Sequence, residues 1–257
     1  MKPVVGIIGF GPFGQFVLKH LSPYFDVKVT SRTKREALAR ELGGEFVSLT
    51  RLLDTSQIVI LSVAIPIIPT LIDEIKDRLK PNTLVLDVAS VKIYPTNIMR
   101  SLLPKDVEVL GTHPLFGPQS GKEGIKGLKI VLTPVRIRDE RLNKVIDFLQ
   151  KVLELEVFVM SPEEHDKAMS RTQVITQYIA RILKGLDIGE EELSLPSYEL
   201  LLKLYKMLGE DSDTLFESIQ LYNPYAVSVR DRLKNICVNI WKDLKEREDI
   251  HKKDGFF

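Results

Sequence analysis

The chain has 257 residues, of which 44% are hydrophobic and 28% charged; this is an ordinary globular composition and excludes wholesale disorder. Its 36 basic and 35 acidic side chains give a net charge of +1, so we expect no nucleic-acid partner recruited by bulk charge. The single cysteine, Cys237, excludes an intrachain disulfide and a cysteine-rich zinc site, and we expect no bound metal and a reducing, cytoplasmic location.

The first 160 residues alternate short apolar runs with helical patterns, which predicts an α/β fold with a Rossmann-type, mostly parallel sheet. Strands are predicted at Val4–Ile8, Val27–Thr30, Ile58–Val63, Thr83–Leu86, Val107–Leu110, Lys129–Leu132 and Leu155–Val159. Helices are predicted at Pro12–Leu21, Lys34–Leu42 and Ile67–Leu79. The longest nearly apolar run, 58–72, has 15 residues and two prolines, so we expect no membrane association.

The pattern changes at Ser161, where Ser161-Pro162-Glu163-Glu164 is a capping box that begins a helix. From there to Leu244 the periodicity is helical, and the formal charge changes from +5 over residues 1–160 to −4 over 161–257. We therefore predict a dinucleotide-binding domain over 1–160 and an all-helical domain over 161–257. Its helices are apolar on more than one face, which predicts a homodimer through this half, whereas the charged tail 245–257 is expected to fray.

A G-x-G-x-x-G motif directly follows the first predicted strand and opens the first helix, the context in which this motif indicates dinucleotide binding. Gly9 permits a tight turn, Gly11 lets the backbone approach a pyrophosphate, and Gly14 lets the helix pack on the strand. The alternative is a glycine-rich turn in another kind of α/β protein. The predicted cofactor-binding residues of this loop are Gly9, Phe10, Gly11, Pro12, Phe13 and Gly14.

The end of the second strand predicts NADP rather than NAD. No acidic residue stands between Asp26 and Glu36, where an NAD-binding protein usually carries a carboxylate for the ribose hydroxyl. Arg32 can pair with a 2′-phosphate and Ser31 can add a hydroxyl, although residues 32–35 could instead only solvate a helix start. The remaining predicted cofactor contacts are Thr33, Ser62, Val63 and Ala64.

Two further segments follow predicted strands: D-V-A-S-V-K at 87–92 and G-T-H-P-L-F-G-P-Q-S-G at 111–121. Open α/β sheets bind ligands at the carboxyl ends of their strands, so both segments are candidates for a site. His113 lies between Thr112 and Pro114 in what reads as a glycine-rich loop, where a packing role is hard to argue. We therefore interpret His113 as functional.

At these residues the chain resembles the prephenate/arogenate dehydrogenase family of tyrosine biosynthesis, and most of all the NADP-dependent branch that includes plant arogenate dehydrogenases. The resemblance spans residues 4 to about 235. Its motifs are G-F-G-P-F-G-Q-F at 9–16, D-V-A-S-V-K at 87–92, T-H-P-L-F-G-P-Q-S-G-K at 112–122, E-H-D at 164–166, T-Q-V-I-T-Q at 172–177, Y-E-L-L-L at 198–202, D-S at 211–212 and L-Y-N-P-Y-A at 221–226.

The resemblance implies oxidative decarboxylation of prephenate to 4-hydroxyphenylpyruvate, with hydride transfer to NADP. His113 matches the family's catalytic histidine and would accept the 4-hydroxyl proton as a neutral base. Ser90 matches the serine that hydrogen-bonds near that hydroxyl, and Thr112 is counted with the substrate-binding group. Lys92 would either orient this loop or meet the ring carboxylate, or else it is a solvated lysine at a helix start.

The helical half departs from the family pattern at one position, since Gln177 stands where members commonly carry a histidine. Gln173 matches a glutamine of several members. His165 matches the frequent E-H-D motif, with a surface or hinge histidine as the alternative. Lys206 aligns where prephenate users tend to have arginine and plant arogenate enzymes aspartate, so it predicts prephenate over arogenate by charge complementarity. A solvated helix face is the alternative for Lys206.

Other functions remain open at this point. The alternative substrate is arogenate, which would make tyrosine directly. A β-hydroxyacid dehydrogenase or imine reductase would also join a Rossmann domain to a helical domain, but with a different substrate loop. A regulator that binds NADP without turnover is the third alternative, which the pairing of Ser90 with His113 disfavours.

Overall fold

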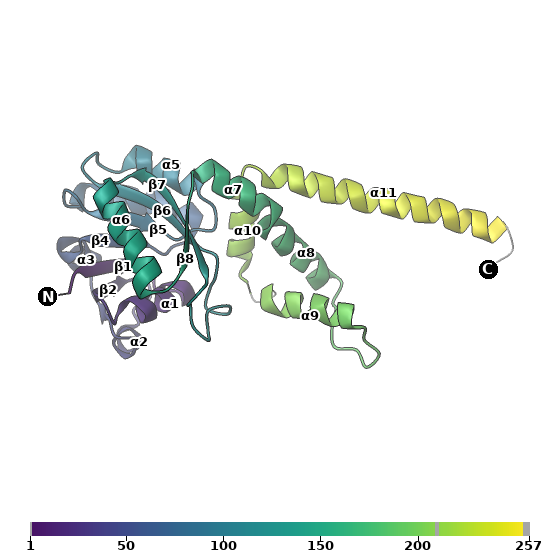
Figure 1. Cartoon of the computed structure of the whole chain (residues 1–257), viewed down its shortest axis with the longest axis horizontal. Coiled ribbons are helices and arrows are strands. Elements are labelled where there is room, and N and C mark those ends of the chain that lie inside the picture. The colour runs from purple at the N-terminus through teal and green to yellow at the C-terminus, as the bar shows by residue number, and fades with distance from the viewer. Residues whose placement is uncertain (1, 209–210, 254–257) are drawn as a thin grey trace.

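The computed structural model describes residues 2–208 and 211–253, which form an α/β part followed by a helical part (Figure 1). The eight strands are β1 (Val4–Ile8), β2 (Asp26–Thr30), β3 (Glu45–Phe46), β4 (Ile58–Leu61), β5 (Leu84–Asp87), β6 (Glu108–Pro114), β7 (Lys129–Arg136) and β8 (Glu156–Val159). They form one sheet in the order β3-β2-β1-β4-β5-β6-β7-β8, in which every pair is parallel except β6 and β7. This confirms the predicted Rossmann-type sheet.

Helices cover both faces of this sheet. The helices of the α/β part are α1 (Pro12–Leu21), α2 (Glu36–Glu41), α3 (Leu49–Thr55), α4 (Ile68–Ile75), α5 (Ile93–Leu102) and α6 (Asp139–Asp147). The predicted helix 67–79 is instead α4 between two 3₁₀ turns, Ile65–Ile67 and Lys76–Arg78. Pro66 and Pro69 lack amide hydrogens, so they stand at the start of each element rather than inside it.

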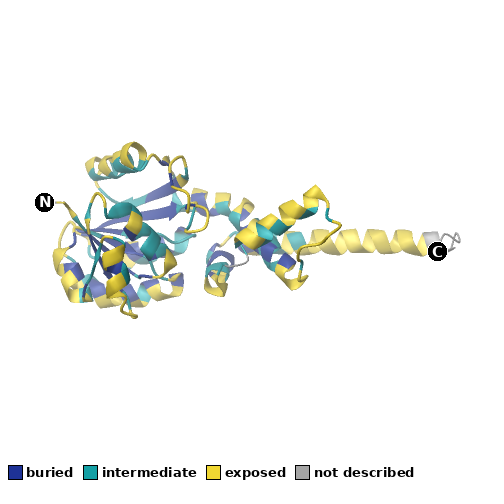
Figure 2. Ribbon diagram, turned by 90° about the horizontal axis from the view of Figure 1, so that it is seen from below, coloured by how far each residue is buried: buried dark blue, intermediate teal, exposed yellow. Residues whose placement is uncertain are grey.

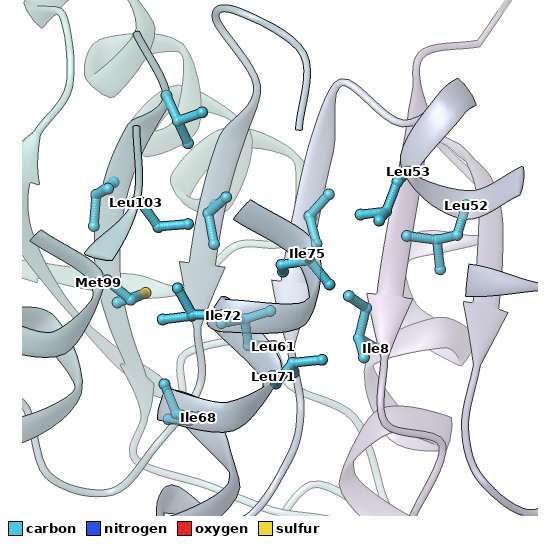
Figure 3. Close-up of a cluster of buried hydrophobic side chains, with 14 of the residues drawn as sticks. Ile8, Leu52, Leu53, Leu61, Ile68, Leu71, Ile72, Ile75, Met99 and Leu103 are labelled. Atoms are coloured by element: carbon cyan, nitrogen blue, oxygen red, sulfur yellow. The ribbon is translucent and has the colours of Figure 1, made fainter. Parts of the chain in front are cut away.

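The two faces of the sheet bury separate hydrophobic clusters because side chains alternate along each strand. Ile8, Val59 and Leu61 point to the face covered by α3, α4 and α5, where the fully buried Leu52, Ile72 and Met99 pack against them (Figure 3). The opposite face holds a second cluster under α1 and α2 and a third under α6. The sheet is thus rigidly held between layers, and its strand ends are fixed in position.

Strand β6 differs from the prediction in a way that matters for the site. The sequence predicts its end at Leu110, but β6 runs on through Pro114 because β7 returns antiparallel and pairs with the extension, His113 opposite Val131. His113 therefore lies in a strand, not in the glycine-rich loop that the sequence predicts. The loop begins after it, at Leu115.

The helical part consists of α7 (Pro162–Arg171), α8 (Gln173–Gly185), α9 (Pro196–Leu208), α10 (Asp213–Tyr222) and α11 (Ala226–Lys253). The capping box before α7 is present, with both reciprocal hydrogen bonds between Ser161 and Glu164. The cluster of buried apolar side chains between α8, α10 and α11 is small, built on Val174, Ile219 and Ala226.

The first turns of helix α11 pack against the other helices, and beyond them the helix projects from the rest of the chain (Figures 1 and 2). It continues through Lys253, so the predicted fraying of 245–257 is wrong up to that residue. Large exposed apolar side chains along it are Val227, Ile236, Val238, Ile240, Trp241, Leu244 and Ile250. Across residues 2–208 and 211–253, no helix combines the length and the apolar character needed to cross a bilayer.

Candidate active site

The glycine loop between β1 and α1 has the geometry that a dinucleotide requires. Gly9 has φ +106°, and a Cβ there would lie 2.0 Å from the Ser62 carbonyl oxygen. A Cβ on Gly14 would lie 2.1 Å from the carbonyl oxygen of Gly9, so α1 packs directly on the loop. A Cβ on Gly11, in contrast, would meet nothing within 4 Å. Gly11 is the N-cap of α1, so the open space beside it faces the unpaired amides of a helix start.

A cavity of about 550 Å³ lies along this loop at the carboxyl edge of the sheet. Of the predicted cofactor residues, those that line it are Gly9, Phe10, Gly11, Ser31, Arg32, Thr33, Ser62, Val63 and Ala64. Pro12, Phe13 and Gly14 form the first turn of α1 beside it. The Ser31 hydroxyl donates to the Thr33 carbonyl at 2.7 Å. A residue that the sequence interpretation missed, Glu74 of α4, also lines the cavity.

A second group of side chains is buried at the same edge of the sheet, at the ends of β5 and β6. Lys92 has no exposed surface, and its ammonium donates to the carboxylate of Asp87 and to the Thr112 carbonyl, the latter at 2.6 Å. The Thr112 hydroxyl in turn donates to the Asp87 carbonyl at 2.6 Å. These bonds tie the end of β5, the start of α5 and the end of β6 together directly beneath His113.

His113 is 3% exposed and contacts the helical part. Its Nδ1 lies 2.8 Å from Nε2 of His165 on α7, and the two rings meet edge to face with centroids 5.0 Å apart. Nδ1 of His165 lies 2.7 Å from Oδ1 of Asp166. Because Nδ1 of His113 is engaged in this way, its Nε2 is the nitrogen left for a substrate.

Asp166 also holds the start of α5. Its Oδ1 accepts the amide of Lys92 at 2.7 Å and its Oδ2 accepts the amide of Ile93 at 2.9 Å. Lys92 is the N-cap residue of helix α5, and its side chain forms no capping hydrogen bond. Asp166 supplies that cap from the other half of the chain, and Asn223 donates to the Asp166 carbonyl at 2.8 Å.

Burial sets the protonation of this group. Burial, with the charges of His165 and Lys92, lowers the pKa of His113 well below its usual value, so its imidazole is neutral near pH 7. Burial also lowers the pKa of His165, although the Asp166 carboxylate opposes the shift. For the buried pair, burial raises the pKa of Asp87 and lowers that of Lys92, and each is opposed by the charge of the other.

The other residues that the sequence predicts for the site lie either near His113 or in the helical part. Ser90 lies partly buried in the loop between β5 and α5, near the end of the strand next to that of His113. Lys92 is neither solvated nor free to meet a substrate, because Asp87 and Thr112 take up its ammonium; the structure supports the other alternative, that it orients the loop. His165 is fully buried and is not a surface histidine.

In the helical part, Gln177 donates to Oδ2 of Asp211 at 2.6 Å, and Oε1 of Gln173 is buried with no hydrogen-bond partner among the described residues. Lys206 is 57% exposed and pairs with Glu190. Within the described part of the chain, Lys206 forms no hydrogen bond or ion pair with the residues around His113. The structure therefore does not bring Lys206 into the site.

Three carboxylates escaped the sequence interpretation: Asp87 and Asp166, which belong to the buried group around His113, and Asp211, which bonds to Gln177 in the helical part. Each stands in a motif that carries the family resemblance, D-V-A-S-V-K, E-H-D and D-S. Their position in these motifs was the available signal. Their partners could not be read from it: Asp87 pairs with Lys92 across a turn, Asp166 pairs with Lys92 and Ile93 of the other half of the chain, and Asp211 pairs with Gln177, which is 34 residues away.

The sheet, the glycine loop and the cleft beside it define a Rossmann-type dinucleotide-binding protein with a helical second part. Comparison with known proteins narrows this class. The profile of the family described as "Prephenate dehydrogenase, nucleotide-binding domain" matches residues 21–168, more than half of the chain. The match includes His113, His165 and Asp166 and begins after the glycine loop. The chain belongs to the prephenate dehydrogenase family.

Relatives with curated names agree with this assignment. Arogenate dehydrogenase 2, chloroplastic, of Arabidopsis thaliana is 32% identical over 253 residues, 93% of this chain and 69% of that protein. Arogenate dehydrogenase 1, chloroplastic, of the same plant is 35% identical over 237 residues, 89% of this chain, which spans only 37% of that protein's length. The crystal structure of prephenate dehydrogenase from A. aeolicus with hydroxyphenyl propionate and NAD+ has the same fold, with a TM-score of 0.73, 20% identity, and coverage of 98% of this chain and 93% of that chain.

Proposed function

We propose that this protein catalyses the oxidative decarboxylation of a cyclohexadienol of the prephenate or arogenate kind, with NADP as hydride acceptor, in tyrosine biosynthesis. The observation that carries the proposal is the buried, neutral imidazole of His113, backed by His165, at the same sheet edge as the dinucleotide cleft. A general base of this reaction must be unprotonated at working pH and held in one orientation. His113 meets both conditions.

The residues divide the work as follows. Nε2 of His113 accepts the proton of the ring hydroxyl, and Ser90 at the neighbouring strand end hydrogen-bonds to that hydroxyl. The nicotinamide supplies the acceptor for the hydride that leaves the same ring carbon. Loss of the ring carboxylate as carbon dioxide then restores aromaticity. The buried Lys92–Asp87 pair fixes the strand end that carries His113.

NADP is proposed over NAD because Arg32 lines the cleft at the end of β2 and no acidic residue stands between Asp26 and Glu36, where an NAD-binding protein usually carries one; Glu74 of α4 is the acidic residue in the lining. Gly11 leaves space for the pyrophosphate, and the first turn of α1 supplies amides to it. The A. aeolicus protein was solved with NAD+. Our proposal rests on the residues of this chain.

For the substrate, a specific observation now favours arogenate over the prephenate that Lys206 predicted. Lys206 is exposed and neutralised by Glu190, so it offers no cation to a side-chain carboxylate. Gln177, the proposed substrate contact of α8, is instead bonded to the carboxylate of Asp211. In the hollow beside Gln177, Asp211 would attract the ammonium of arogenate, whereas Arg181 and Lys184, which line the same hollow, would attract carboxylates. The proposal of arogenate therefore rests on the loss of Lys206 as a partner for the side-chain carboxylate of prephenate.

The test is an absorbance assay of nicotinamide reduction that crosses prephenate and arogenate with NAD and NADP. We expect turnover with arogenate and NADP to exceed the other three combinations. In His113→Asn, turnover should fall by about 10²–10⁴ while NADP binding is retained. Dinucleotide binding without turnover of either cyclohexadienol would contradict the proposal and favour a regulator, and Asp211→Asn should shift preference toward prephenate.

We also propose that the active form is a homodimer through the helical part. The large apolar side chains on α11, among them Ile240 and Trp241, are exposed in one chain, and the core of the helical part is small. A second copy that covered them would bury roughly 2,000 Å² or more, as obligate dimers do. Sedimentation as a monomer at micromolar concentration would contradict this.

A further inference from the structure

The hydrogen bonds around Asp166 determine where the protons of the two histidines lie. Backbone amides can only donate, so the Asp166 oxygens that face Lys92 and Ile93 are acceptors, as in an ionised carboxylate. With the carboxylate ionised, Nδ1 of His165 carries the proton that is donated to Oδ1 of Asp166. In the neutral ring Nε2 of His165 is therefore bare and accepts from Nδ1 of His113.

This sequence of donors and acceptors ends at Nε2 of His113, which is left without a proton. Each link has the length of a good hydrogen bond, 2.7 Å from Asp166 to His165 and 2.8 Å from His165 to His113. All three side chains are buried, so water does not compete for these nitrogens. The tautomer that a base requires is thus set by a carboxylate two side chains away.

We propose that His165 and Asp166 are positioning residues that hold His113 in this tautomer, and that His165 receives the second proton of His113 during turnover. The proposal rests on the proposed function. When the substrate hydroxyl gives its proton to Nε2 of His113, the Nδ1 proton of His113 moves to Nε2 of His165. His113 ends neutral, and His165 ends as an imidazolium beside the Asp166 carboxylate.

The surrounding charges favour this final position of the proton. His113 faces His165 and the ammonium of Lys92, and both disfavour a positive charge on it. His165 faces the same ammonium but also the carboxylates of Asp166 and Asp87, which favour a positive charge. A cation is therefore better accommodated on His165 than on His113, and proton transfer between them prevents charge from accumulating on the base.

The tautomers can be tested without substrate, by nitrogen-15 NMR of the histidine side chains in the full-length protein at neutral pH. We expect the proton of His113 on Nδ1 in the parent. In Asp166→Asn, the amide oxygen in place of Oδ2 still accepts from Ile93, whereas the NH₂ group in place of Oδ1 donates to His165 and no longer accepts from the amide of Lys92. Every link then reverses, and the proton of His113 should be found on Nε2. A parent His113 protonated on Nε2, or no reversal in the variant, would overturn the proposal.

Kinetics separate the two halves of the proposal. Asp166→Asn should lower kcat by about 10²–10⁴, the usual contribution of a general base, with NADP affinity within twofold of the parent. Glu163→Gln removes the same charge from an exposed position of the first turn of α7 and should leave kcat unchanged. His165→Gln still offers an acceptor to His113 but cannot take a proton, so the tautomer should persist while kcat falls at least tenfold. An unchanged kcat in His165→Gln would overturn the relay.

The NMR result does not depend on which substrate the protein turns over. Failure of the proposed function, with no turnover of either cyclohexadienol, would leave the tautomer assignment standing on its own measurement. If Asp166→Asn does not fold, the parent spectrum and His165→Gln still decide the question, because each has a result that contradicts the proposal.

Discussion

Replacing Lys92 by methionine isolates the contribution of the buried ion pair beneath His113. Methionine keeps the length of the side chain but removes the ammonium that bonds to Asp87 and to the Thr112 carbonyl. Asp87 is then a fully buried carboxylate without a counter-charge, and its remaining partner is the amide of Ala89 at 2.9 Å. Breaking a buried pair in this way costs about 3–5 kcal/mol.

The cost should depend on pH, because Asp87 can escape it by binding a proton. Burial already raises the pKa of Asp87, and loss of the ammonium raises it further. A carboxyl with a raised folded pKa is stable below its unfolded pKa of about 3.9 and loses stability as pH rises. Holding it protonated costs about 1.5 kcal/mol at pH 5 and about 4 kcal/mol at pH 7, at about 1.4 kcal/mol per unit. The lost hydrogen bond to Thr112 adds about 1 kcal/mol at both.

Urea unfolding followed by far-ultraviolet circular dichroism at pH 5 and pH 7 measures this difference. The matched control is the double variant Lys92→Met with Asp87→Asn, which removes both charges and should lose less stability, by the same amount at each pH. Lys92 also lowers the pKa of His113 and of His165, and its charge is absent from both the single and the double variant, so the comparison of these two variants isolates the contribution of Asp87. A penalty for Lys92→Met that is equal at the two pH values, or a double variant no more stable than the single one, would refute this reasoning.

Three further results are expected. Arg32→Ala should lower the affinity for NADP about 10- to 150-fold in calorimetric titration and leave the affinity for NAD nearly unchanged. The reason is that only NADP has the 2′-phosphate, with which a charge-assisted bond of about 1.5–3 kcal/mol is lost. Equal losses of affinity for the two cofactors would contradict this. Gly11→Ala should keep the free energy of unfolding within about 0.5 kcal/mol of the parent while NADP binding falls, because its Cβ meets nothing within 4 Å. Gly9→Ala should instead destabilise the fold, because its Cβ would lie 2.0 Å from a carbonyl oxygen. Finally, burial lowers the pKa of His113 and of His165 in the folded protein. As pH falls, these histidines are therefore protonated at a higher pH in the unfolded chain than in the folded one, which favours unfolding. Stability should be full above pH 6.5 and decline below it by up to about 1.4 kcal/mol per pH unit and histidine; a flat profile between pH 7 and 5 would show that they are not buried as neutral rings.

The parts of the fold that sequence alone predicted are those with local causes. The glycine loop, the Pro12–Leu21 helix and the capping box at Ser161 each depend on residues a few positions apart, and the structure has all three. The parallel sheet followed from the alternation of apolar runs and helical patterns. The bounds of helix α5 were not predicted, because its start is capped by Asp166, which is 74 residues away from Lys92.

The candidate site shows the same division. His113 was found from its motif, but its place in a strand depends on pairing with β7 that no local pattern announces. Lys92 reads as a solvated lysine until the burial of Asp87 beside it is known. His165 reads as a surface residue of an amphipathic helix until α7 packs on β6, which joins positions 52 residues apart. The sequence identified the residues that could do the chemistry, but it did not show which residues they would contact.

The strand order also determines when the catalytic group can form during folding. The central strands β1 and β4 pair residue 5 with residue 58. We expect this pairing to form after the β-α-β unit between them, because it closes a long loop. The bonds of Asp166 to the start of α5 and of His165 to His113 span 52 to 74 residues and need the finished sheet edge as their platform. We therefore expect these contacts to form late, after the sheet, so that a chain that has completed only its nucleotide-binding part holds a cleft for the cofactor but has no oriented base.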